Sequence, residues 1–558
     1  MMLLAKKPLK KEEATRKKTL SLLLAVVMTF ALCTSVMAEA DVSQPMTVSI
    51  FMQADDNPAN ADEENPVISY WRGLYNLEID WQKPPQGSEQ EQLNMMLGTG
   101  DYTDVIDLGF NTENLTTLYE DHVIYDLAPY LEEYMPNYYA FLNAPENADV
   151  KSVMFDDEGH LFNIAMVEEM PMQWGGLVYR RDILETMTGG NIAFPSGSSE
   201  PATIADWEYM LELMKQYFTA AGLEDHACLI IPSVGYFATG ELMAAFGIGG
   251  VDYLDNDGKV RYGIAEDQFY TYLTTMRDWY EKGYVYADFA SRTQDLFYLP
   301  NTALTYGGAA GIWFGLNQQL GTGMSMPEYG LNMNVQPLVA PTGVEGVDKP
   351  LGVYLFAGRA NNNSGFVITT ACDEAKLLRI MSAFDLFFSE EGSCIRTMGL
   401  TVDEGAAECE TYIKMGVTQG TRLPNSRTWT EEMNASTNNV VDFAADRMPG
   451  VRVHYEPRTA DLVDGKSYAQ IGRDAWTAYG NGNVYPLSVS FTQEETNRYT
   501  AISLNLQDYA NGMIAKFIMG REELTPETFK AYQDQLKALG LEEYLQIKQA
   551  AYDRFIAR

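Results

Sequence analysis

Strand-like and helix-like segments alternate regularly between residues 47 and 108. They succeed one another as strand, helix, strand, helix and strand: 47–53, 66–75, 77–81, 88–98 and 104–108. Because helices connect these strands, the strands are expected to lie parallel in a sheet covered on both faces. Ser88, followed by Glu91, predicts a capping box at the start of the second helix. The sequence therefore predicts an α/β fold.

A second unit of the same class begins near Gly175. Residues 177–179 and 302–306 have the pattern of strands, and 255–258 that of a hairpin turn. Thr203 is a candidate N-cap for a helix that buries one apolar face. A chain of 558 residues exceeds the size of a single hydrophobic core.

The two units are expected to form two discontinuous lobes. Residues 46–165 and 335–420 are assigned to the N-terminal lobe, and 166–334 and 421–558 to the C-terminal lobe.

The N-terminus has the order of a secretory signal. Seven Lys and Arg residues between Lys6 and Lys18 precede an apolar run over 20–32, and small residues end at Ala38. We expect residues 1–38 to be a signal peptide, too short in its apolar part to span a bilayer, and the protein to act outside the cytoplasm. Leu32 stands where a lipoprotein signal has a small residue, so secretion is favoured and lipid attachment at Cys33 stays open.

Charge and cysteine content exclude several functions. The formal net charge of -38, with no basic stripe, argues against a nucleic-acid partner. The four histidines are scattered and there is no CxxC pair, so no metal and no cofactor are expected. The turn at Asp255 resembles part of a calcium loop, but Tyr253 replaces the first acidic ligand. Four cysteines could form disulfides or remain buried thiols: Cys228, Cys372, Cys394 and Cys409.

The common catalytic motifs are missing from the sequence. It has no Gly-x-Ser-x-Gly elbow, phosphate-binding P-loop or HExxH pair. Neighbouring carboxylates such as Glu168 and Glu169 cannot flank a glycosidic bond, because that chemistry needs two carboxyl groups on opposed surfaces. No catalytic residue is predicted.

A ligand is expected outside the carboxyl ends of the strands, where loops diverge. Sugars present a weakly apolar ring face and a belt of hydroxyls, which aromatic rings and planar polar groups hold well. The candidates in the first lobe are Asp55, Trp81, Asp107, Phe110 and Asn111, and those in the second are Tyr236, Tyr306, Trp313 and Phe314. Trp313, in an expected loop, is as consistent with a core position as with a contact. Trp207 and Trp279 lie on helical stripes and are assigned to the core.

Several segments together resemble a known family. They are "LNMMLGTGDYTDVI" from Leu93, "DDEGHLFNIA" from Asp156, "DNDGKVRYG" from Asp255, "TALTYGGAAGIWFG" from Thr302 and "ALGLEEYLQIKQAAYDRF" from Ala538. In their order and spacing the chain resembles the extracellular solute-binding proteins, family 1, of ABC importers. The resemblance is to the carbohydrate-binding branch related to maltose- and alginate-oligosaccharide-binding proteins.

The resemblance implies a type II periplasmic-binding-protein-like fold, in which two α/β lobes on a hinge close over a ligand. It implies aromatic stacking by Trp313 and Phe314, contacts near Asp107, and a contact from Trp174 at a lobe crossing. The sequence departs from the family pattern over 400–405, so no contact is carried over there.

We expect a monomeric, non-enzymatic protein that captures a carbohydrate and delivers it to the transmembrane subunits of an ABC permease. A receptor for a peptide, a polyamine or another small solute, an exported glycoside hydrolase and a structural protein of the cell surface remain alternatives.

Overall fold

The computed structural model describes most of the chain beyond residue 40. The described residues are 41–53, 66–85, 87–109, 115–170, 173–223, 225–235, 240–291, 299–354, 359–360, 365–399, 448–453, 463, 466–486 and 488–557. The expected signal peptide, with Cys33, lies outside them, as does Cys409. Within these ranges no helix has the length and apolarity needed to cross a membrane.

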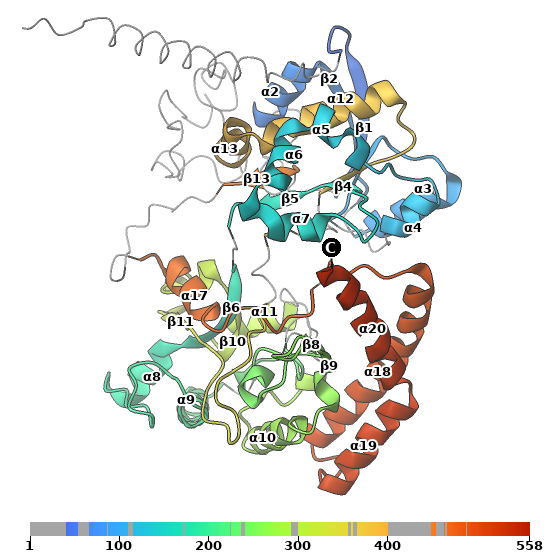
Figure 1. The fold of residues 1–558 in the computed structure, drawn as a ribbon. Helices are drawn as coiled ribbons and strands as arrows, with labels where there is room; N and C mark the ends of the chain where they lie inside the picture. The colour runs from blue at the N-terminus through green and yellow to red at the C-terminus, as the bar shows by residue number, and fades with distance from the viewer. Residues whose placement is uncertain are drawn as a thin grey trace, which may run out of the picture.

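The first sheet has five strands in the order β2-β1-β3-β12-β4 (Figure 1). Its strands are β1 (Met46–Phe51), β2 (Leu77–Gln82), β3 (Val105–Asp107), β4 (Asn163–Ile164) and β12 (Phe366–Ile368). The helices α2 (Pro66–Tyr75) and α3 (Glu89–Thr99) connect the first three strands, which confirms the expected alternation. β1 is parallel to β2 and β3, but β12 is antiparallel to its neighbours β3 and β4. The sheet is therefore mixed rather than wholly parallel, because a strand from far along the chain inserts into it.

Helices cover both faces of this sheet. The other described helices of the first lobe are α4 (Leu115–Glu120), α5 (Leu131–Tyr134), α6 (Pro136–Asn143), α7 (Ala148–Met154), α12 (Glu374–Asp385) and α13 (Glu390–Met398). On one face Val48 and Ile50 pack with Trp71 of α2, whose indole nitrogen donates to the Ala383 carbonyl at 2.7 Å. On the other face Phe51 packs against α3. Successive residues of a strand point to opposite faces, which explains the two separate cores.

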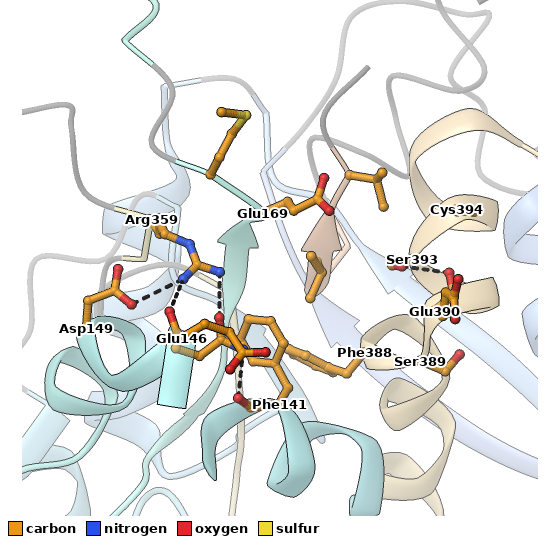
Figure 2. A pocket seen from close by; sticks show the side chains of 14 residues that line it. Phe141, Glu146, Asp149, Glu169, Arg359, Phe388, Ser389, Glu390, Ser393 and Cys394 are labelled. Carbon is orange, nitrogen blue, oxygen red and sulfur yellow. Dashed lines mark hydrogen bonds and ion pairs between the residues drawn. The ribbon is translucent and has the colours of Figure 1, made fainter. Parts of the chain in front are cut away.

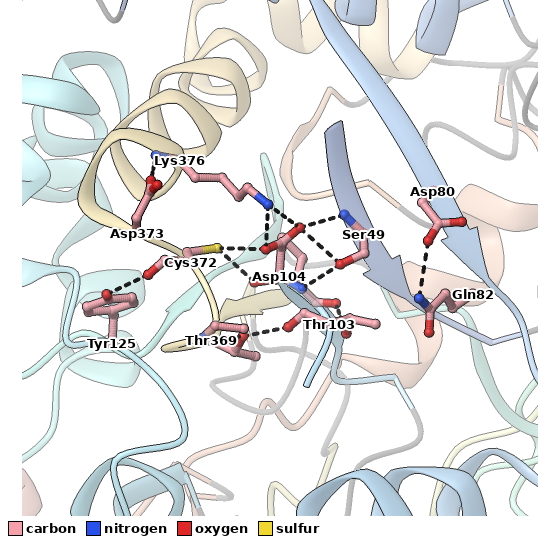
Figure 3. A network of polar contacts seen from close by, with 12 residues as sticks. Ser49, Asp80, Gln82, Thr103, Asp104, Tyr125, Thr369, Cys372, Asp373 and Lys376 are labelled. Carbon is pink, nitrogen blue, oxygen red and sulfur yellow. Dashed lines mark hydrogen bonds and ion pairs between the residues drawn. The ribbon is translucent and has the colours of Figure 1, made fainter. Parts of the chain in front are cut away.

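A buried carboxylate at the amino end of β3 joins that strand to β1 and α12 (Figure 3). Asp104 accepts hydrogen bonds from the Ser49 amide at 2.8 Å and from Lys376 Nζ at 3.0 Å. Although burial opposes ionisation of this carboxyl, the hydrogen bonds from Ser49 and Lys376 hold the pKa of Asp104 below its ordinary value. This network fixes the end of the sheet opposite to the one where a ligand is expected.

The second sheet has four strands in the order β11-β6-β10-β7. They are β6 (Gly175–Arg180), β7 (Ala227–Leu229), β10 (Ala310–Leu316) and β11 (Val335–Pro337). β10 is parallel to β7, and β6 is antiparallel to both β10 and β11. The start of β6 and the end of β10 therefore lie at the same edge of the sheet.

The helices of the second lobe include the last three of the chain (Figure 1). The described helices of the second lobe are α8 (Arg181–Thr188), α9 (Ile204–Ala220), α10 (Phe269–Glu281), α11 (Leu299–Tyr306), α17 (Tyr468–Trp476), α18 (Gln493–Ile518), α19 (Pro526–Ala538) and α20 (Leu541–Ile556). The predicted N-cap Thr203 accepts from the Asp206 amide. Trp207 and Trp279 are fully buried and stacked, with ring centroids 6.4 Å apart, which confirms their core assignment.

Between the described elements, the chain passes from one sheet to the other three times. The passages lie between β5 (Met166–Glu168) and β6, between β11 and β12, and between β13 (Gly450–Arg452) and α17. β5 pairs with β13, and Val167 and Val451 belong to the core of the first lobe. We propose the division into two lobes at these passages. The expected boundary at residue 335 is too early, because Val335 pairs with Arg180 in the second sheet.

Local predictions were mostly confirmed, with two exceptions. The hairpin at Asp255 joins β8 (Asp252–Leu254) to β9 (Val260–Tyr262), as expected. The expected strand at 302–306 is the end of helix α11, and the strand begins at Ala310. A short apolar run does not distinguish helix from strand, and Gly308 at φ +75 marks the true change of direction. Ser88 makes no capping bond, because its hydroxyl donates to the Pro85 carbonyl instead. Cys228, Cys372 and Cys394 are buried thiols.

Candidate ligand-binding site

Two predicted residues lie at the carboxyl ends of parallel strands in the first sheet. Trp81, near the end of β2, is half-buried, and its indole nitrogen has no hydrogen-bond partner. Asp107, at the end of β3, is 4% exposed, and its Oδ1 accepts from the Gly109 amide at 2.9 Å. Because β1 lies between β2 and β3, Trp81 and Asp107 are at the same edge of the sheet but do not contact each other.

At the edge of the second sheet, Trp174 and Phe314 meet. Their ring centroids are 6.4 Å apart and their planes are inclined by 69°. Trp174 directly precedes β6 and Phe314 lies near the end of β10, so the antiparallel pairing of these strands brings the two rings together. Gly175 makes this approach possible, since a Cβ there would lie 2.8 Å from a ring carbon of Phe314. The sequence placed both aromatics in the site, and the structure brings them into contact.

Two amide side chains flank Trp174. The backbone amide of Asn317 donates to the Trp174 carbonyl at 2.9 Å, and the side-chain Nδ2 of Asn317 donates to the Gln173 carbonyl at 3.1 Å. Gln173 is 1% exposed, and its Nε2 donates to the Gly175 carbonyl. These hydrogen bonds fix the backbone on both sides of the Trp174 indole.

The oxygens of these two amides lack donors. Gln173 Oε1 and Asn317 Oδ1 are buried and have no hydrogen-bond partner. A buried acceptor without a donor costs about 1–3 kcal/mol, which a bound hydroxyl or water can recover. Sequence reasoning missed both residues, although their position beside Trp174 and at the end of an aromatic strand was a usable signal. The edge therefore combines an aromatic pair with two unsatisfied acceptors.

The structure places Trp313 on the face of β10 opposite Phe314, and Tyr306 away from this edge. Trp313 and Phe314 are each 3% exposed inside β10, but the Trp313 indole donates to Gln319 Oε1 at 3.2 Å, so Trp313 is a core residue of the strand rather than part of a loop. Side chains alternate along a strand, which turns Trp313 to the face opposite Phe314. Tyr306 is 43% exposed and ends α11, before the amino end of β10. It is therefore at the far edge of the sheet from Trp174.

Four predicted contact residues lie outside the described residues: Asp55, Phe110, Asn111 and Tyr236. Their assignment to the site stays a prediction.

The two edges belong to surfaces that approach each other. Helix α4 follows β3, and Thr117 on it donates to Gln493 Oε1 at the start of α18, at 2.8 Å. In Figure 1 the first lobe lies above the second, with α4 and α7 on the side facing it. Helix α4, the next described element after β3, and strand β6 thus both lie on sides of the lobes that face each other.

A pocket of about 690 Å³ lies elsewhere in the first lobe, beside the passages between the sheets (Figure 2). Phe141 and Phe388 form part of its wall, together with Glu169 and Glu390. Arg359 lines it as well, donating to the Glu168 carbonyl at 3.1 Å and to Asn147 Oδ1 at 2.8 Å. None of the predicted contact residues lines this pocket, and the guanidinium joins one passage to the first lobe.

The structure gives no support to a metal site among the residues it describes, which contain no group of three or more His, Cys, Asp or Glu side chains placed to hold an ion. Asp255, in the turn that resembles a calcium loop, binds Arg261 Nε at 2.8 Å and accepts from the Lys259 amide. Its carboxylate therefore stabilises the hairpin.

The mixed α/β fold of this chain is shared with solved structures of solute-binding proteins of ABC transporters. No family model matches the sequence. The chain is 22% identical over 512 residues to the fructooligosaccharide ABC transporter substrate-binding protein FusA of Streptococcus pneumoniae, covering 86% of this chain and 85% of FusA.

Solved structures of similar proteins share the fold of this chain. The complex of S. pneumoniae FusA with kestose superposes with a TM-score of 0.64 at 19% identity, over 92% of this chain and all (100%) of that one. A human-milk-oligosaccharide-binding ("HMO binding") solute-binding protein from Bifidobacterium longum infantis gives 0.68 at 18% identity, over 92% and 99%. The alginate-binding protein AlgQ2 gives 0.63 at 19%, over 92% and 99%. The resemblance inferred from the sequence segments is thereby confirmed at the level of the fold.

Proposed function

We propose that this protein is the substrate-binding component of an ABC-type importer, which captures an oligosaccharide outside the cytoplasmic membrane and delivers it to a membrane permease. The observation that carries the proposal is the edge formed by Trp174, Phe314, Gln173 and Asn317. An aromatic ring can cover the apolar face of a sugar, while the two amide oxygens accept from its hydroxyls.

The similar proteins support the same ligand class. FusA was solved with kestose and an EF-hand mutant of FusA with fructo-nystose, and other proteins of this fold bind milk oligosaccharides or alginate. The protein binds its ligand without chemical change, since the similar proteins are transporter subunits. It acts as a monomer.

The two lobes are proposed to close on the ligand from opposite sides. Trp81 and Asp107 belong to the wall of the first lobe, and Trp174 with Asn317 to the wall of the second. A ligand that contacts both walls binds the closed arrangement better than the open one, and so shifts the population towards it. The permease then recognises the closed protein.

A thermal-shift panel tests the ligand class. It contains fructooligosaccharides, milk oligosaccharides, N-glycans and alginate oligosaccharides, with short peptides and spermidine as competing classes. Ligand at a hundred times its Kd stabilises the folded protein by about 2.7 kcal/mol. An oligosaccharide that raises Tm, with no release of reducing ends, supports the proposal. Stabilisation by peptides or spermidine alone, or hydrolysis of the sugar, contradicts it.

A further inference from the structure

The last helix of the chain reaches the first lobe. Arg554, near the end of α20, donates from Nε to Asp157 Oδ2 at 3.0 Å, across 397 residues of sequence. Asp157 lies in the turn between α7 and β4, and Arg554 belongs to the second lobe. The two side chains are 25% and 35% exposed, so water screens this ion pair only in part.

Arg554 is held in position before it meets Asp157. Its Nη1 and Nη2 bind both oxygens of Glu495 at 3.0 and 2.6 Å, and Nη2 also donates to the Ser490 carbonyl. Although burial opposes ionisation of Glu495, Arg554 and the Thr492 amide hold the pKa of its carboxyl below its ordinary value. Because both Nη atoms of Arg554 are already bound to one carboxylate, the side chain loses little further conformational entropy when its Nε binds a second carboxylate.

A second contact joins the same surfaces. Thr117 of α4 donates to Gln493 at 2.8 Å, and Gln493 lies two residues before Glu495 in the first turn of α18. In the first lobe, α4 and the turn at Asp157 are packed together by three rings. Tyr119 lies 4.9 Å from His160 and 5.2 Å from Phe162 between centroids. The two contacts therefore join one packed patch on each lobe.

These contacts lie away from the passages between the lobes. In Figure 1, β13, β6 and α17, which bound two of the passages, are on the left, whereas α4, α20 and the C-terminus are on the right. Contacts at the margin opposite a hinge break first when two lobes swing apart, because displacement grows with distance from the hinge.

We propose that Asp157–Arg554 and Thr117–Gln493 form an interlobe latch that favours the closed arrangement. The latch increases the fraction of closed protein in the absence of ligand and slows ligand release. Its effect on ligand release rests on the proposed function, but its effect on the position of the lobes does not.

The first test measures the distance between the lobes without ligand. Spin labels on L74C in α2 and L504C in α18, both at exposed positions, report this distance by pulsed electron resonance in a C409S background. Asp157→Asn is expected to raise the population of long distances about 3- to 10-fold, the range for a partly exposed ion pair of roughly 1 kcal/mol. The matched control is Glu158→Gln, whose side chain is 80% exposed in the same turn. It should leave the distribution unchanged.

Arg554 also binds Glu495, so an Arg554 variant removes two contacts at once. A double-mutant cycle isolates the contact with Asp157. Arg554→Gln and Asp157→Asn together should open the lobes no further than the stronger single variant, since each removes the same bond. Additive effects, or a wild-type distribution in Asp157→Asn, overturn the latch. With any sugar found in the panel, Asp157→Asn should raise the dissociation rate about 3- to 10-fold. A protein that binds no sugar but opens in Asp157→Asn would reject the proposed function and keep the latch.

Discussion

The indole of Trp476 lies directly over Gly176, the second residue of β6. A Cβ on Gly176 would lie 2.5 Å from the ring carbons Cδ1 and Cδ2 of Trp476, and the indole nitrogen donates to the neighbouring Leu177 carbonyl at 2.9 Å. Helix α17 follows the third passage between the lobes, and β6 follows the first passage. The contact of Trp476 with Gly176 therefore fixes α17 to β6. The ring packs against the strand that positions Trp174.

Gly176→Ala is expected to destabilise the protein, because the added methyl group cannot fit beneath a fully buried indole. Overpacking of this kind costs about 1–3 kcal/mol. Gly512→Ala in the middle of α18 has nothing within 4 Å of its new Cβ and should be neutral or stabilising by up to about 1 kcal/mol. Urea unfolding of the two variants measures the difference. Equal stability of both would contradict the described packing of Trp476.

Trp174 and Trp313 should respond differently to substitution. Trp174→Ala should weaken sugar binding about 10-fold or more with little loss of stability, since about 1.4 kcal/mol of contact energy corresponds to a factor of ten. Trp313→Phe should lower stability by about 1–3 kcal/mol and leave affinity nearly unchanged, because Trp313 is a core residue bonded to Gln319. Calorimetric titration and thermal unfolding separate the two effects. The reverse pattern would restore Trp313 as the contact residue.

Lys376→Met should lower stability at neutral pH by about 1–3 kcal/mol, because it leaves the buried Asp104 carboxylate without its cation. The pKa of Asp104 is lowered in the folded protein, so its contribution is present above the unfolded value of 3.8 and is lost as the pH falls through the folded value. The deficit of the variant should therefore shrink in acid. Lys530→Met, which removes an exposed pair with Asp534, is the control and should cost little at any pH. A deficit independent of pH would argue against the charge interaction.

Asp385 should make the protein less stable as the pH rises from about 4 to 6. Burial raises the pKa of its carboxyl to about 6, although it accepts from the Tyr138 amide at 2.9 Å. The folded state therefore holds this proton more tightly than the unfolded state, and stability falls by about 3 kcal/mol across the window before levelling off. The difference in unfolding free energy between wild type and Asp385→Asn, followed against pH, should change over this window alone. Parallel curves would contradict the shift.

The sequence by itself determined the elements whose signal is local. The alternation over 46–107, the buried face of α9 and the N-cap at Thr203 followed from periodicity and short-range hydrogen bonding, which residues close in the chain decide. The sequence also predicted Trp174 and Phe314 as site residues, and the structure brings these two rings into contact. The resemblance of several segments in order gave the class of fold.

Only the tertiary structure decided what depends on pairing between distant segments. The insertion of β12 into the first sheet, the burial of Trp313 and the exposure of Tyr306 depend on which strands become neighbours. The same holds for the unsatisfied oxygens of Gln173 and Asn317 and for the contact between Arg554 and Asp157. Local sequence patterns determine whether a segment forms a helix or a strand. Burial and hydrogen bonding of its side chains depend on the distant segment that packs beside it in the fold.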